Sequence, residues 1–170
     1  PAKTRTLRRF LNHVWILGDE AYAKSLKRRL AQVADTECGR AEMNKLVDAG
    51  QDLRIGPAEP GRPCVEPDGY NGYYKTRPDP NGPVLANTYD QNGRIVRQDP
   101  CFIAGRGDPT GSTIRYNPDE KIGEHTPDVV IAHELAHAGN FSRGESKCGL
   151  ARNEPGYADR WRNIEEQQAV

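Results

Sequence analysis

The sequence lacks several features that would direct it to a particular class of function. Among its 170 residues, 24 Lys and Arg balance 24 Asp and Glu, so the formal net charge is zero. Neither nucleic acid nor an anionic membrane is therefore indicated as a partner. No apolar run approaches membrane-spanning length, and no secretory signal peptide is recognisable. A missing signal does not assign the protein to the cytoplasm, because specialised secretion systems use unstructured leaders or carrier domains.

Cysteine is scarce, and the four residues are scattered at Cys38, Cys64, Cys101 and Cys148. The absence of a CxxC pair argues against a structural zinc site. An even number at wide spacing permits two disulfides in an oxidising compartment, with three connectivities, while reduced thiols are the alternative. A cysteine nucleophile is not supported.

The most informative segment that is present is His133-Glu134-Leu135-Ala136-His137, an HExxH motif. Histidines four residues apart lie on one face of a helix, so both imidazoles can reach one metal ion. A catalytic zinc needs such a pair, a third protein ligand and an open position for water. Glu134 is rotated off the ligand stripe, where it can take a proton from the zinc-bound water.

The flanks of the motif predict a buried helix with punctuated ends. The residues before it, Val129 to Ala132, are apolar, and Thr126, Pro127 and Asp128 suit the N-cap and first turn. Gly139 is expected to take the left-handed position after the last turn. The alternative is a structural helix whose polar groups are satisfied by hydrogen bonds, which is costly for three such groups without a shared partner.

A third histidine ligand is not attractive. In the metzincin pattern, HExxHxxGxxH, the positions of Gly and the last His hold Asn140 and Arg143 here. His125 immediately precedes the motif helix and cannot easily fold back onto it. His13 lies in a segment that contains Leu and Trp and is expected to be a packed helical residue.

A downstream carboxylate is a better third ligand. Glutamate zincins carry it on a second helix, with a small residue three positions on, and Glu166 with Ala169 fits this spacing. Glu165 is the rival, because it falls on the expected buried face of a continuous helix from Tyr157. A capping box at Asn163 would instead give Glu166 a structural role. Asp159 is a weaker candidate, since the GTxD-like signature of aspartate zincins is absent.

The whole chain, residues 1–170, is expected to form one α+β domain with a zincin-like fold. A helical lead-in occupies about residues 1–50, with helices over Arg5–Ile16, Ala21–Val33 and Arg40–Ala49. Asp52–Ile55 is a predicted strand, followed by a Pro/Gly-rich loop at about 56–83 in which no regular element is expected.

The catalytic part is expected at about 84–170. Val84–Gln98 predicts a β-hairpin with Asn92-Gly93 as its turn, and Ser112–Tyr116 predicts a strand. Because Ser112–Tyr116 immediately precedes the motif helix, it is our candidate for the edge strand that pairs with an extended substrate.

In three blocks of its sequence, the chain resembles the bacterial effector zinc metallopeptidases. This group includes the NleD-like type III effectors and the metallopeptidase domains of polymorphic toxins. The three blocks are a central block (Thr113–Pro118 and Pro127–Ala138), a C-terminal block (Glu165-Glu166 with Ala169-Val170), and an upstream block (Ala31–Thr36, Gly39-Arg40 and Leu46-Val47). The resemblance implies a glutamate-zincin fold and a secreted virulence protease acting on proteins of another cell. It also implies that His133 and His137 are zinc ligands, Glu134 is the base and one of the paired glutamates is the third ligand.

The sequence leaves parts of the function open. Tyr157, Tyr116 and His125 are candidates for stabilising the oxyanion, and the sequence does not choose among them. Two other functions compete with the peptidase: a degenerate zincin that only binds a partner, and an amidase acting on peptidoglycan peptides. A cognate immunity protein is expected only for a toxin directed at rival bacteria.

Overall fold

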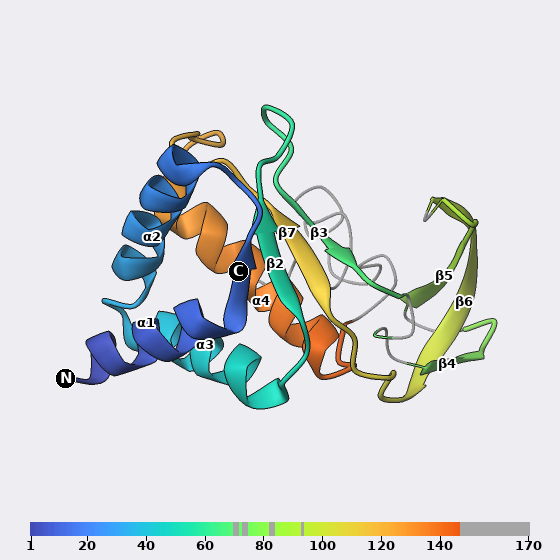
Figure 1. The fold of residues 1–170 in the computed structure, drawn as a ribbon. Helices are drawn as coiled ribbons and strands as arrows, with labels where there is room; N and C mark the ends of the chain where they lie inside the picture. The colour runs from blue at the N-terminus through green and yellow to red at the C-terminus, as the bar shows by residue number, and fades with distance from the viewer. Residues whose placement is uncertain (70–71, 73–74, 82–83, 93, 147–170) are drawn as a thin grey trace.

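The computed structural model describes residues 1–146 except 70–71, 73–74, 82–83 and 93. This part of the chain contains four helices and seven strands arranged as a mixed α/β structure (Figure 1). The helices are α1 (Ala2–His13), α2 (Glu20–Val33), α3 (Glu37–Ala49) and α4 (Pro127–Ser142). The strands are β1 (Val14–Ile16), β2 (Leu53–Gly56), β3 (Cys64–Pro67), β4 (Lys75–Pro78), β5 (Val84–Tyr89), β6 (Ile95–Gly105) and β7 (Ser112–Arg115).

Local capping explains where the N-terminal helices begin and end. Asp19 accepts a hydrogen bond from the Tyr22 N–H at the start of α2, and Thr36 accepts one from the Gly39 N–H at the start of α3. Gly50 follows α3 at φ 71°, the left-handed conformation that glycine adopts without strain. The predicted α2 and α3 are confirmed, with α3 starting three residues earlier than expected.

The first predicted helix is correct only as far as His13. Val14–Ile16 leaves the helix and becomes β1, which pairs in parallel with β2. The β-branched and aromatic side chains of this segment favour a strand, and sheet pairing overrides its helical spacing.

A four-stranded sheet has the order β1-β2-β7-β3. The first three strands are parallel, and β3 runs antiparallel to β7 at the edge. The predicted strand at Ser112–Tyr116 exists as β7, but its assignment as the edge strand is wrong. Its first three residues are all buried, as suits an interior strand, whereas β3 alternates between exposed and half-buried residues.

A second sheet, of order β4-β6-β5, lies to one side of the body (Figure 1). The predicted hairpin is confirmed by the antiparallel pair β5 and β6, although β6 continues to Gly105. At the turn, the Asp90 carboxylate accepts hydrogen bonds from the N–H groups of Asn92 and Arg94. Gly93, the other residue of the predicted turn, lies outside the described residues.

The expectation of no regular element at 56–83 is wrong, because this segment supplies β3 and β4. Both are short edge strands that end in proline, at Pro67 and Pro78. Proline has no backbone N–H. An edge strand tolerates it at positions whose N–H would point away from the sheet, because no neighbouring strand needs that donor.

The main core lies between the four-stranded sheet and the helices. One row of paired side chains faces the helices: Ile16, Ile55, Ile114 and Val65. The alternate row faces away from them: Trp15, Arg54, Thr113 and Glu66. Helix α4 packs against α2, α3, β7 and β3, so it is held from several sides.

Cys38 and Cys64 carry exposed free thiols, and Cys101 is buried. None of the three two-disulfide arrangements is present, because each would need both Cys38 and Cys64. Cys148 lies outside the described residues. Within the described part of the chain, no helix is long and apolar enough to cross a membrane.

Candidate active site on helix α4

Helix α4 holds the HExxH residues in a largely buried setting. Its N-cap is Thr126 and Pro127 occupies the first turn, as predicted, although the Thr126 side chain makes no capping hydrogen bond. Ile131, Leu135 and Ala138 are fully buried in the core. The helix is thus fixed by packing on both sides of the motif.

The predicted end of the helix at Gly139 is wrong. Residues up to Ser142 continue the helix, and Gly144, at φ 66°, takes the left-handed conformation instead. Burial of Phe141 favours the extra turn. Gly139 lies inside the helix, where a Cβ would come within 3.3 Å of a Glu42 carboxylate oxygen of α3.

The two motif histidines converge. Their Nε2 atoms are 2.9 Å apart, and the rings meet edge to face with centroids 4.6 Å apart. His137 is 7% exposed, whereas His133 is half-buried. Imidazole nitrogens bound to one tetrahedral zinc at ordinary bond lengths lie about 3.3 Å apart. The two Nε2 atoms would therefore have to move apart by a few tenths of an ångström, which small side-chain rotations can provide.

Glu134 is buried on the same helix, which packs against the edge strand β3. The Glu134 residue is 6% exposed. Although Cys64 is an exposed residue overall, partial desolvation of its thiol, and then the negative charges of Glu66 and Glu134, raise the pKa of that thiol on β3. This coupling indicates that Glu134 and the start of β3 are near enough to interact electrostatically.

The third ligand cannot be placed from the described residues. Glu166, Glu165 and Asp159 all lie outside them, as does Tyr157. Within residues 1–146, apart from the few that are not described, no group of three His, Cys, Asp or Glu side chains is arranged to hold a metal. The described part of the chain thus brings together the two expected histidine ligands and holds the expected base, Glu134, buried on the same helix.

The other candidates from the sequence lie in structural roles. The Tyr116 hydroxyl is buried and donates a hydrogen bond to the Pro127 carbonyl oxygen at 2.5 Å. His13 ends α1, and its Nε2 is 2.9 Å from the Gln51 carbonyl oxygen. His125 is exposed and its backbone pairs with that of Ile122. Tyr116 is therefore occupied in holding the start of α4.

Strand β3 is the element at this site that sequence reasoning missed. The Asp68 N–H donates to the Gly111 carbonyl oxygen, so Asp68, and by alternation Glu66 and Cys64, direct their backbone groups towards β7. Val65 and Pro67 therefore direct theirs to the outer edge, which no described strand covers and where proline has no N–H. A proline after alternating exposed residues was the available signal for an edge strand.

Comparison with known proteins decides the family. A family described as effector protein, the M91 peptidases, matches residues 12–170. This chain belongs to the M91 peptidase family. Searches of curated proteins and of solved structures found no match.

The M91 match covers nearly the whole chain, including α4 and both C-terminal glutamates. It confirms the resemblance to bacterial effector metallopeptidases that the motif and its flanks indicated. Membership identifies the chain as an effector peptidase, and it does not by itself assign a substrate, a cofactor or the roles of individual residues.

Proposed function

We propose that this chain is a zinc-dependent endopeptidase of the glutamate-zincin type that hydrolyses peptide bonds in proteins of a target cell. The observation that carries the proposal is the convergence of the His133 and His137 Nε2 atoms, 2.9 Å apart on the buried helix α4. Membership of a peptidase family supports the peptide bond as the bond that is broken. A direct hydrogen bond between the two rings is the competing explanation of the contact.

His133 and His137 would hold the zinc ion together with Glu166, with Glu165 as the alternative third ligand. Zinc in such a site polarises the scissile carbonyl and lowers the pKa of water towards neutrality. A metal binds only neutral imidazole, so zinc binding by such a pair should weaken in acid.

Glu134 is the proposed general base. Its position in the motif directs its carboxylate away from the ligand stripe, and the residue is buried on a helix that packs against β3. It would accept a proton from the attacking water and deliver it to the nitrogen of the leaving amine. The carboxylate ends the reaction in the state in which it began.

The backbone of β3 would hold the substrate. The outward N–H and C=O of Val65 can exchange two hydrogen bonds with an extended peptide, while Pro67 removes the next donor along the edge. This supports polypeptide over a peptidoglycan amide, the main competing substrate. A degenerate module that only binds is disfavoured, because such a domain would have no need to retain Glu134.

The decisive variant is Glu134→Gln, with Glu124→Gln in the exposed loop before α4 as the matched control. We expect Glu134→Gln to lower kcat/KM on a quenched fluorescent peptide library by about 10²–10⁴-fold while keeping its zinc. Glu124→Gln should behave as wild type. Normal turnover in Glu134→Gln would refute the mechanism. Activity on muropeptides but not on peptides would refute the substrate class.

Family membership also supports delivery into another cell by a specialised secretion system. A cognate immunity protein would follow if that cell is a rival bacterium and would not be expected for a eukaryotic host. The two targets can be separated by expressing the chain in bacterial cells and in eukaryotic cells and measuring the growth of each. The Glu134→Gln variant is the control in both.

A further inference from the structure

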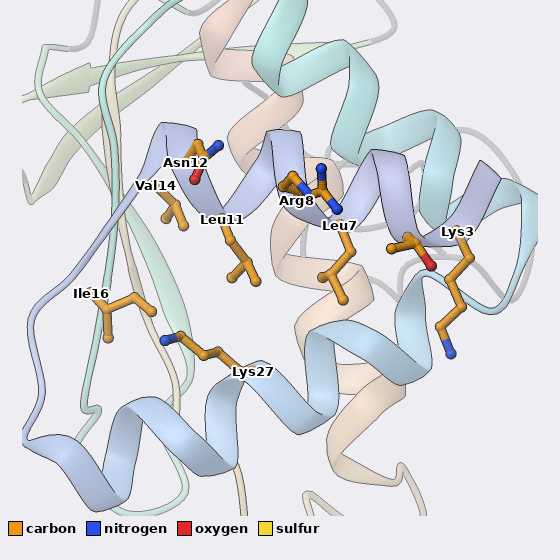
Figure 2. A pocket seen from close by; sticks show the side chains of 9 residues that line it. Lys3, Leu7, Arg8, Leu11, Asn12, Val14, Ile16 and Lys27 are labelled. Atoms are coloured by element: carbon orange, nitrogen blue, oxygen red, sulfur yellow. The ribbon is translucent and has the colours of Figure 1, made fainter. Parts of the chain in front are cut away.

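A hollow of about 660 Å³ lies between α1, α2 and the edge strand β1 (Figure 2). Leu7 and Leu11 point from α1 towards α2, and Val14 and Ile16 close the end formed by β1. Lys27 reaches into the same space from α2. None of the lining residues belongs to α4 or β3, so this hollow is distinct from the candidate active site.

The floor of the hollow is apolar and only partly covered. Leu7, Leu11 and Ile16 are partly buried residues at the border of the core, whereas Phe10 on the same helix is fully buried. Helix α1 packs mainly on α3, and α2 packs mainly on α4. The two helices therefore leave apolar surface between them that a ligand could cover.

The lining of the hollow is basic although the whole chain is neutral. Three lining residues, Lys3, Arg8 and Lys27, are basic, and none of the lining residues is acidic. At the rim, Lys3 is paired with Asp35, but Arg8 and Lys27 make no ion pair with any described residue. An occupant should therefore combine apolar side chains with negative charge.

Backbone groups that pair with no other described residue border the same hollow. The Leu17 N–H donates to the Ile55 carbonyl oxygen, so Leu17 and, by alternation, Trp15 direct their backbone groups towards β2. The N–H and C=O of Ile16 then point to the edge of the sheet that no described strand covers, next to the hollow that its side chain lines. An extended chain could pair with this edge.

We propose that this hollow is a docking site for an acidic, amphipathic segment of a partner protein, separate from the peptidase site. Alternate apolar side chains would enter the hollow, the acidic ones between them would meet Arg8 and Lys27, and the backbone would pair at Ile16. An anionic membrane fits less well. A protein that binds a membrane surface inserts apolar side chains that project outwards from the protein. The apolar side chains of this hollow are instead recessed between two helices.

The test uses a fluorescein-labelled peptide of about ten residues with alternating leucine and glutamate, followed by fluorescence anisotropy. A leucine–lysine peptide of the same length is the ligand control. We expect binding of the acidic peptide only, and a loss of about tenfold or more in Arg8→Glu/Lys27→Glu. Lys121→Glu/Arg94→Glu, which makes the same charge change at exposed positions elsewhere, should bind as wild type.

A photocrosslinker at Asn12, which lines the hollow, should attach to the acidic peptide, while one at Lys121 should not. Equal binding of both peptides, or an equal loss in both double variants, would overturn the proposal. So would binding to phosphatidylglycerol vesicles through Arg8 and Lys27 without peptide binding, which would reassign the surface to membranes. Peptidase activity should be unchanged in Arg8→Glu/Lys27→Glu.

Discussion

Replacing Tyr116 by phenylalanine separates a structural role from a catalytic one. The hydroxyl is buried and donates to the Pro127 carbonyl oxygen at 2.5 Å, which ties the end of β7 to the first turn of α4. The variant loses one hydrogen bond, and Pro127 keeps its acceptor role within the helix. We therefore expect a loss of about 1 kcal/mol in the free energy of unfolding, within a range of about 0.5–1.5.

Tyr116→Ala should cost several times more, about 3–5 kcal/mol, because it leaves a cavity in the core. Urea unfolding followed by circular dichroism measures the free energy of unfolding of both variants. In thermal unfolding, Tyr116→Phe should lower the Tm by about 2–4 °C for a chain of this size. Peptidase activity of the folded Phe variant should stay within about threefold of wild type.

Two results would refute this reasoning. A Tyr116→Phe variant as unstable as Tyr116→Ala would show that the hydroxyl does more than make one hydrogen bond. A stable variant that binds zinc but has lost activity would return Tyr116 to the role of oxyanion donor.

Three further predictions concern stability. Gly144→Ala should cost about 2–4 kcal/mol in urea unfolding, because its Cβ would overlap a backbone carbonyl before β7 in addition to the left-handed strain. Gly50→Ala, left-handed but in open space, should cost only about 1 kcal/mol, and equal losses would contradict the overlap. Leu135→Ala, fully buried beside the motif, should cost about 2–5 kcal/mol, and a neutral effect would mean that α4 is not packed as described. Burial raises the pKa of Tyr22 and Tyr116, so above about pH 10 the native state holds protons that the unfolded chain loses. The free energy of unfolding should then fall by about 1.4 kcal/mol per pH unit for each tyrosine, and a double Phe variant should lack that slope.

The sequence predicted the elements whose signals are local. Helices α2 and α3 carry side-chain caps, and the Pro127 start of α4 follows from its position in the first turn. The hairpin of β5 and β6 and the strand at β7 were also foreseen. These features depend on residues close together in the chain, so short-range patterns suffice.

The predictions that were wrong concern segments whose structure depends on residues far away in the sequence. Val14–Ile16 continues a helical pattern and becomes a strand because β2 lies beside it. Cys64–Pro67 lies in a Pro/Gly-rich stretch and becomes a strand because β7 offers an edge. Gly139 ends the local pattern, yet burial of Phe141 extends α4 beyond it. Tertiary contacts overrode local preference in each case.

At the candidate site, the spacing of His133 and His137 predicted that both rings lie on one face of a helix, and their Nε2 atoms are 2.9 Å apart on α4. That they bind one metal ion stays a prediction. The position of β3 was not predictable, because only the folded sheet brings it near Glu134. The choice between Glu166 and Glu165 remains a prediction from the sequence.

The central claim is tested most directly by the metal content of protein purified without chelator or metal-affinity resin. Elemental analysis would compare wild type with His137→Ala, Glu166→Ala and Glu165→Ala. We predict about one zinc per chain in wild type, lost in His137→Ala and in Glu166→Ala but kept in Glu165→Ala. If, of the two glutamate variants, only Glu165→Ala lost its zinc, Glu165 would be identified as the third ligand. No zinc in wild type, even after addition of excess metal, would contradict the account and leave the histidine pair as a structural hydrogen bond.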